Sequence, residues 1–240
     1  MLSFNHLRDG FCLLLIAISV CSVSYGQSTA EVRSAVDLTP GGIGLDAGIE
    51  VPTAHFQFAC IGCQSGEQTE AAKHIESALK LMVVQSQQAT GKGKALLVKS
   101  IDELQTLAGQ LKNGTAVSAK QLKYGFARAH HALANHHQEL AEKDWSQHNL
   151  ESAGKHIQAS VYYARSGLGW LGDDVKTKAN DAYQTTSDLG SKLVRGAKHD
   201  AGVVQEKTRF LASKVSDFGK RLFSVADGQK KAAAEKSIVR

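Results

Sequence analysis

Proline is scarce in this chain and is confined to its beginning. There are two prolines, Pro40 and Pro52, and none follows up to the last residue, Arg240. A proline inside a helix costs about 3 kcal/mol, so its absence permits long helices. In the same stretch apolar residues recur at alternate steps of three and four, which predicts an all-α body.

The short motifs that mark common catalytic sites are also lacking. The chain contains no glycine-rich phosphate-binding loop, no Gly-x-Ser-x-Gly nucleophile elbow and no His-Glu-x-x-His zinc motif. Its carboxylates are scattered among lysines, as on solvated helix faces, and form no paired arrangement typical of acid–base catalysis. We therefore expect a protein that is not an enzyme and that needs no cofactor.

One long apolar run is present, from Phe11 to Val23. With Arg8 before it and the small residues Ser24 and Gly26 after it, residues 1–26 are typical of a secretory signal peptide. A helix of this length rises about 20 Å, too short for a membrane core of about 30 Å. We expect an exported protein, periplasmic or secreted and not transmembrane. The alternative is a lipoprotein anchored at Cys21, because Ile18-Ser19-Val20 before it loosely matches a lipoprotein signal.

The net charge of +5 is unevenly distributed. Residues 27–172 contain 13 basic and 13 acidic residues, whereas residues 173–240 contain 14 basic and 9 acidic ones. This surplus favours contact with an anionic surface such as lipid or an acidic cell-wall polymer, although a soluble charged helix would also explain it. We expect a protein or envelope-surface partner and no nucleic acid. The candidate contact residues are Lys192, Arg195, Lys198, Lys207, Lys214, Lys220 and Arg221.

The chain after the signal peptide divides into four segments. Residues 27–65, with several glycines and both prolines, predict an irregular lead-in that includes a short extended piece. Residues 66–172 predict two antiparallel helical hairpins, about 67–112 and 117–171, packed as a four-helix bundle or a short solenoid. Residues 173–227 predict a long amphipathic helical segment, and residues 228–240 a disordered basic end.

The apolar stripe of the segment 173–227 is rich in small residues and threonine, and it carries several glycines. Each glycine costs about 1 kcal/mol relative to alanine in a helix. Such a helix needs support from the bundle, from an anionic surface or from a second copy of itself. The sequence therefore also suggests a homo-oligomer formed through this C-terminal helix.

The succession of alanine-rich hairpins resembles the YfdX-type family of exported bacterial helical proteins. The resemblance rests on the pattern from Glu67 to Leu171 and on the segment from Leu140 to Gly154. The hairpin from Leu140 to Leu168 also resembles tetratricopeptide-like hairpins in its geometry. The likeness implies a helical, non-enzymatic envelope protein that acts by contact, as a scaffold, an adaptor or a stress protein.

Histidines are concentrated in one part of the chain and suggest a second function. None of the spacings within the third predicted helix places two of them one turn apart, so they are first interpreted as histidines that border a core. The alternative is a periplasmic metal-binding or buffering protein that holds zinc or copper between helices. Its candidate ligands are His130, His136, His137 and His156, with His74 as a further one.

The pair Cys60 and Cys63 would remain after removal of the signal peptide. In an oxidising compartment we expect a structural disulfide between them. A thiol-redox protein is a weaker alternative, because the motif lacks the βαβ surroundings of thioredoxin-like sites. A copper or zinc site formed by both cysteines and His55 is a third possibility.

Overall fold

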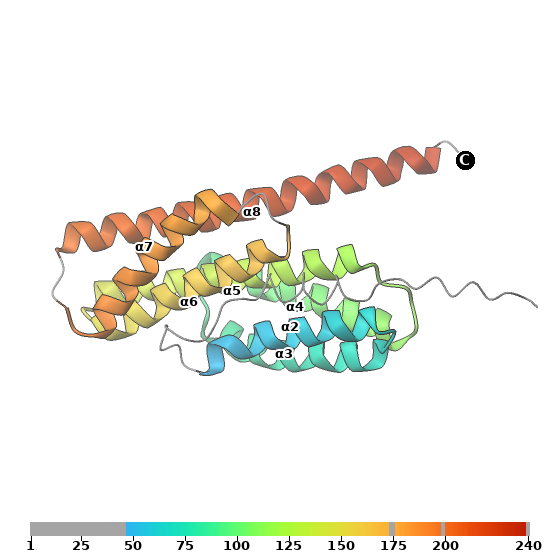
Figure 1. The fold of residues 1–240 in the computed structure, drawn as a ribbon, viewed down its shortest axis with the longest axis horizontal. Helices are drawn as coiled ribbons and strands as arrows, with labels where there is room; N and C mark the ends of the chain where they lie inside the picture. Colours follow the sequence, from blue (N-terminus) through green and yellow to red (C-terminus); the bar gives the residue numbers. More distant parts are fainter. Residues whose placement is uncertain (1–46, 173–175, 198–199, 239–240) are drawn as a thin grey trace, which may run out of the picture. The chain divides into compact units, whose positions relative to one another are not determined.

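The structure is a computed structural model that describes the backbone of residues 47–172, 176–197 and 200–238, and the side chains of residues 51–172, 181–197 and 200–222 (Figure 1). Within this part every regular element is a helix, which confirms the expected all-α fold. The predicted signal peptide and the lipoprotein alternative lie outside the described residues. The helices are α2 (Ala47–Gln64), α3 (Gln68–Gln88), α4 (Gly91–Lys112), α5 (Ala119–Ser146), α6 (Leu150–Gly169), α7 (Lys176–Val194) and α8 (Ala201–Ile238).

Helix α2 corrects the prediction of an irregular lead-in at 27–65 from Ala47 onward, while residues 27–46 lie outside the described residues. This helix includes Pro52, which deprives the helix of one main-chain hydrogen bond. Packing offsets that cost, because the helix buries one face and Phe56 stacks on Phe126 of α5 with 4.7 Å between ring centroids. Buried residues of α2 recur at helical spacing, among them Thr53, Phe56, Ala59 and Cys60.

The two predicted hairpins are present within a larger bundle. α3 packs on α4, and α5 packs on α6. In addition, α2 contacts both α3 and α5, while α4 also packs on α5. Helix α5 therefore has α2, α4, α6 and α8 around it, and this arrangement decides where its side chains lie.

The tail predicted as one helical segment over 173–227 consists of two helices. α7 ends at Val194, and Gly196 turns the chain with φ of 73° before α8 begins at Ala201. α8 continues to Ile238, so the end predicted to be disordered, 228–240, is helical as far as it is described. The glycine supplies a left-handed backbone conformation that residues with a Cβ atom rarely adopt, and for this reason the chain can turn there.

The backbone structure repeats itself at a distance of 82 positions. Gly66 after α2 and His148 after α5 both have positive φ, 79° and 59°. The same hydrogen bond closes both turns: the N–H of Glu67 donates to the carbonyl of Gly62 at 2.8 Å, and that of Asn149 to the carbonyl of Asp144 at 2.9 Å. Both are Schellman-type helix ends.

The correspondence extends to the next helices. Gly114 after α4 and Gly196 after α7 have φ of 67° and 73° and close equivalent turns. The side chain of Ser118 caps α5 by accepting from the N–H of Gln121 at 3.2 Å. Asp200 caps α8 in the same way, accepting from the N–H of Val203 at 3.3 Å.

Helices α2, α3 and α4 thus form a first repeat, and α5, α6 and α7 form a second one. Helix α8 follows the second repeat in the same way as α5 follows the first. The sequence shows the same relation where Ala71, Lys73, His74 and Ile75 correspond to Ala153, Lys155, His156 and Ile157. The protein is therefore a tandem of two three-helix repeats followed by a last helix.

Two glycines allow α6 and α7 to approach closely. A Cβ on Gly190 would lie 2.9 Å from the carbonyl oxygen of Gly154, and a Cβ on Gly154 would lie 2.6 Å from that of Gly190. Such distances leave no room for a methyl group on either helix. The cost of Gly190 in the isolated helix is therefore offset by close helix packing.

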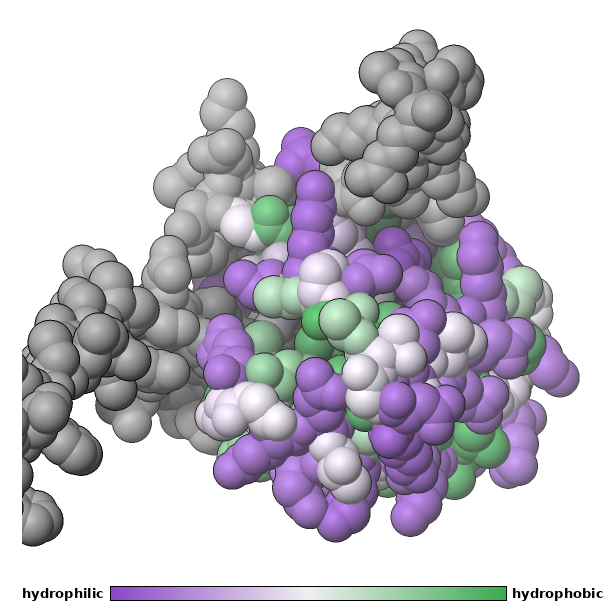
Figure 2. All heavy atoms as spheres, turned by 90° about the vertical axis from the view of Figure 1, so that its right-hand side faces the viewer, coloured by the Kyte–Doolittle hydropathy of each residue, from purple (hydrophilic) through white to green (hydrophobic). Residues whose placement is uncertain are grey.

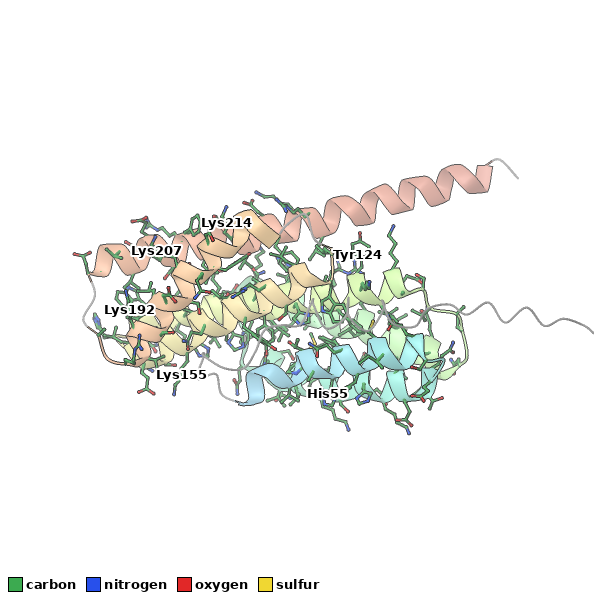
Figure 3. The ribbon with its side chains drawn as sticks, in the orientation of Figure 1. His55, Tyr124, Lys155, Lys192, Lys207 and Lys214 are labelled. Atoms are coloured by element: carbon green, nitrogen blue, oxygen red, sulfur yellow. The ribbon has the colours of Figure 1, made fainter. Side chains whose placement is uncertain are left out.

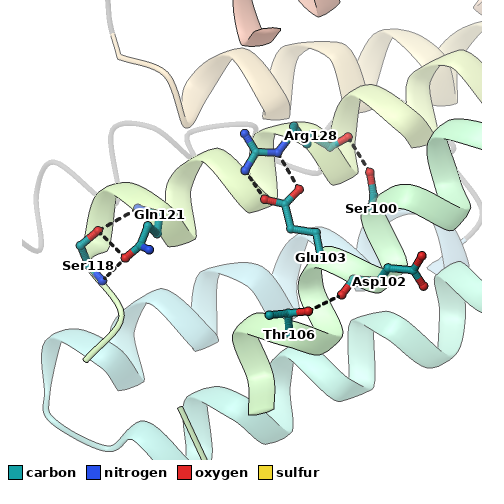
Figure 4. A network of polar contacts seen from close by, with 7 residues as sticks. All are labelled: Ser100, Asp102, Glu103, Thr106, Ser118, Gln121 and Arg128. Atoms are coloured by element: carbon teal, nitrogen blue, oxygen red, sulfur yellow. Dashed lines mark hydrogen bonds and ion pairs between the residues drawn. The ribbon is translucent and has the colours of Figure 1, made fainter. Parts of the chain in front are cut away.

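An ion pair joins α4 and α5 (Figure 4). The guanidinium of Arg128 donates two hydrogen bonds to the carboxylate of Glu103, one of them at 2.6 Å. Both side chains are mostly buried, and a two-pronged geometry is the strongest form of such a pair. The hydroxyl of Ser100 adds a bond to the carbonyl of Arg128 at 3.4 Å.

The surface of the described residues is mainly hydrophilic at the end of the molecule that Figure 2 shows, with small hydrophobic areas between polar ones. Large apolar side chains that are exposed are scattered over four helices: Phe58, Ile61, Val83, Val84, Val98, Val203 and Phe210. None of the helices, within the residues described, is long and apolar enough to cross a membrane.

Candidate functional site

The four histidines of α5 lie inside the protein and do not border its core as expected. His130 is completely buried, and His131, His136 and His137 are at most 6% exposed. The reason is the position of α5, whose opposite faces are covered by different helices. His131 packs edge-on against Phe218 of α8.

His130 and His131 use their ring nitrogens within the fold. For His130, Nε2 lies 3.0 Å from the hydroxyl of Thr53 and Nδ1 lies 2.7 Å from the carbonyl of Phe126. Nε2 of His131 lies 3.1 Å from the carbonyl of Val215. Because both ring nitrogens of His130 have partners within the fold, the structure does not favour the prediction of this residue as a metal ligand.

Burial lowers the pKa of these histidines, because the charged imidazolium would lose its water. The pKa of His130, of His131 and of His136 is lowered to about 4 in each case, with burial as the main cause. Burial also lowers the pKa of His137 well below its usual value, and the neighbouring His136 and His156 add to this shift. At neutral pH all four are uncharged.

His137 of α5 meets His156 of α6 across the helix interface. Their Nδ1 atoms are 3.0 Å apart, and the rings are tilted by 33° with 5.2 Å between centroids. On the other side of His156, Nε2 lies 3.5 Å from a carboxylate oxygen of Asp144. That carboxylate favours a proton on Nε2 of His156, which leaves its Nδ1 as an acceptor and makes Nδ1 of His137 the donor.

The first repeat contains an equivalent pair. His55 of α2 and His74 of α3 face each other with 3.2 Å between their Nδ1 atoms, a ring tilt of 38° and 5.5 Å between centroids. This pair is half-buried, and Phe58 lies against His74. Burial lowers the pKa of His55, with a smaller contribution from His74.

The region around His137 contains polar atoms that lack partners. In the described part of the chain, the buried atoms Nε2 of His137 and Oε2 of Glu139 make no hydrogen bond. The other oxygen of Glu139 accepts from the N–H of Gly93 at the start of α4, at 2.9 Å.

No three side chains of His, Cys, Asp or Glu lie close enough to hold one metal ion, as far as residues are described.

The predicted disulfide between Cys60 and Cys63 is wrong, because both thiols are free. Both residues lie within α2, three positions apart. In an α-helix such residues have Cβ atoms about 5–6 Å apart, whereas a disulfide needs about 3.5–4.5 Å. Burial raises the pKa of both thiols, which makes them poor nucleophiles at neutral pH.

The predicted contact residues lie on α7, on α8 and between them. Lys192 and Arg195 are exposed, and neither is paired with another described residue. Lys207 and Lys214 are half-buried, and the ammonium of Lys214 lies 5.1 Å from the ring centroid of Phe210 (Figure 3). The other three differ: Lys220 pairs with Asp217 at 3.1 Å, Arg221 lies near Tyr183, and Lys198 lies outside the described residues.

The pair His55–His74 was not predicted from the sequence, although a signal for it was present. Both histidine pairs have members 19 positions apart, and Lys-His-Ile occurs at 73–75 and again at 155–157. A comparison of the chain with itself at a shift of 82 positions would have aligned the two pairs. The same comparison would have aligned residues 55–62 with 137–144 of the second predicted hairpin, and would therefore have indicated a helix there.

Comparison with known proteins finds no match among family models, curated proteins or solved structures. The resemblance to YfdX-type proteins therefore stays a prediction from the sequence pattern.

Proposed function

We propose that the protein is an exported, non-enzymatic helical-repeat scaffold that binds an anionic surface of the cell envelope through α7 and α8. The observation that carries this proposal is the pair Lys192 and Arg195 at the end of α7. Both are exposed and have no acidic partner among the described residues. The field of an unpaired cation acts fully on an external anion, whereas a neighbouring carboxylate partly cancels the field of a paired one.

The packing of α8 supports a role in binding for the side of this helix that faces away from the rest of the protein. The apolar stripe of α8 is buried against the protein's own helices, with Val204, Val215 and Leu222 fully buried. That stripe is not free for a second copy of the chain as far as Leu222. A homo-oligomer through the C-terminal helix would therefore have to use the exposed Val203 and Phe210 or residues beyond Leu222, and the basic side chains of the outer side remain available for contact with an anionic surface.

Binding to vesicles tests the proposal. The full chain is sedimented with vesicles of neutral lipid containing an anionic lipid, at rising salt concentration. A basic residue near an anionic membrane contributes about 1 kcal/mol, so Lys192→Ala with Arg195→Ala should weaken binding roughly 30-fold. Retention should also fall as the Debye length drops below about 10 Å.

A matched control removes the same charge elsewhere. Lys80 and Lys94 are exposed on α3 and α4, and Lys80→Ala with Lys94→Ala should leave retention nearly unchanged. If both double variants lose binding equally, only net charge matters and α7–α8 is not the contact face. If the full chain shows no salt-sensitive retention on anionic vesicles or on an acidic cell-wall polymer, the proposal fails.

A further inference from the structure

The two histidine pairs have more in common than their position in the repeat. In both, the helix that begins the repeat supplies one imidazole and the next helix supplies the other. In both, the Nδ1 atoms face each other at 3.0–3.2 Å, although one pair is half-exposed beside Phe58 and the other is largely buried beside Asp144. The same nitrogen-to-nitrogen geometry thus occurs in two different surroundings.

We infer that each pair, His55–His74 and His137–His156, is a binding site for one divalent transition-metal ion of the zinc or copper class, held by the two Nδ1 atoms. This inference is independent of the proposed surface contact.

The spacing of the nitrogens fits such an ion. Zinc binds histidine nitrogens at about 2.0–2.1 Å, so two of them at a tetrahedral angle lie about 3.3 Å apart. The observed 3.0 and 3.2 Å require each pair to open by only a few tenths of an ångström. The metal then replaces the proton that the two nitrogens share in the free protein.

The protonation of the second pair also suits a metal. Asp144 favours the proton on Nε2 of His156 and leaves Nδ1 with a lone pair, as a carboxylate behind a metal-bound histidine commonly does. His137 can move its proton from Nδ1 to Nε2, a buried atom that makes no hydrogen bond in the described part of the chain. No proton therefore has to leave the protein.

The ligand type sets the class of ion. Imidazole nitrogens suit zinc, copper and nickel, while magnesium and calcium prefer oxygen ligands. No third His, Cys, Asp or Glu completes either pair among the described residues, so water supplies the other positions. We expect weaker binding than at structural zinc sites with four protein ligands.

The half-exposed pair gives the cleaner test. His55 is labelled on α2 in Figure 3, and both members of its pair are partly open to solvent. The full chain, purified without a histidine tag, is titrated with Zn²⁺ and with Cu²⁺ by calorimetry. Two ions per chain are expected. His55→Ala should reduce this to one, and His55→Ala with His137→Ala to none.

His148 supplies the matched control. It is exposed, belongs to neither pair and has φ of 59°, a conformation that asparagine tolerates well. His148→Asn removes one surface imidazole and should leave the stoichiometry at two. Circular dichroism without metal shows whether each variant keeps its helices, and because His137 is buried, His156→Gln serves as a second variant for that pair.

A spectroscopic measurement distinguishes coordination of the metal ion by a histidine pair from nonspecific metal binding. Copper(II) bound to the His137→Ala variant should show an electron paramagnetic resonance spectrum with two equivalent nitrogen ligands, and His55→Ala should show the same from the other pair. The inference is overturned if folded His55→Ala binds as many ions as the unchanged protein. It is also overturned if His148→Asn removes an ion, or if neither metal binds.

Discussion

Acidification should unfold this protein over a defined range of pH, because its central helix buries several neutral histidines. In the unfolded chain a histidine has a pKa near 6.5. In the folded protein the pKa of His130, His131 and His136 is lowered to about 4 in each case. Between these two values the unfolded state binds protons that the folded state does not, so falling pH favours unfolding.

The size of the effect follows from the shifts. Each of the three histidines contributes about 1.4 kcal/mol per pH unit across this window, or about 3 kcal/mol in all. Together they would remove about 10 kcal/mol, which is comparable to the whole stability of a typical domain, 5–15 kcal/mol. Above pH 6.5 the free energy of unfolding is not reduced by these histidines, and it falls progressively as the pH is lowered to about 4.

The charged neighbours do not reverse this sign. Lys92 lowers the pKa of His131 further, and His156 does the same for His136. Main-chain carbonyls act in the other direction on His130 and His131, but burial is the larger cause in both. Asp144 favours the charged form of His156 alone, and even there the net shift of the pKa is downward.

Urea unfolding followed by far-ultraviolet circular dichroism measures the effect. The free energy of unfolding, taken at pH values from about 7.5 to 4.5, should fall by at least about 4 kcal/mol per pH unit below pH 6.5, because His137, whose pKa is also lowered, adds to the three histidines counted above. His131→Gln should reduce that slope by about 1.4 kcal/mol per unit, whereas His148→Asn, at an exposed site, should not change it. A free energy that stays flat from pH 6.5 to 5 would refute the reasoning.

Three further predictions concern packing, turns and thiols. Gly190→Ala should destabilise the protein by about 1–3 kcal/mol in thermal unfolding, because the methyl group meets α6, whereas Gly109→Ala, with open space around it, should stabilise it by up to about 1 kcal/mol. His148→Gly should raise stability by about 0.5–1 kcal/mol, since φ is 59° there, and an unchanged melting temperature would contradict this. Cys63 should react with a thiol reagent in the native protein, and the buried Cys60 only after unfolding. If no free thiol is detected even after unfolding, the two cysteines form the disulfide that the sequence predicted.

The periodicity of the sequence was sufficient to predict helices, including both hairpins between residues 66 and 172. It did not predict α2, because Pro52 and the nearby glycines are typical of irregular structure and the spacing of Thr53, Phe56 and Cys60 is a weaker signal over so short a stretch. A proline argues against a helix only through its local cost. Burial of one helix face against α3 and α5 contributes more than that cost, and this packing is not visible in the local sequence.

The histidines could be located but their burial could not be predicted. A helical projection of α5 shows which side chains share a face, and it sets His131 opposite the apolar stripe formed by Leu122, Phe126 and Leu133. It does not show that α8, starting at Ala201, covers that opposite face. The contact joins residues far apart in the sequence, so no local pattern predicts it.

Helix α5 follows the first repeat and begins the second, and α8 occupies the equivalent place after the second one. Ala119 and Ala201 open these two helices after equivalent caps, Ser118 and Asp200. A copy of residues 119–200 inserted after Asp200 would therefore meet only junctions that the chain already contains. The architecture has no fixed length: this protein is one member of a possible series, and each added repeat would bring one more histidine pair at a regular interval along the array.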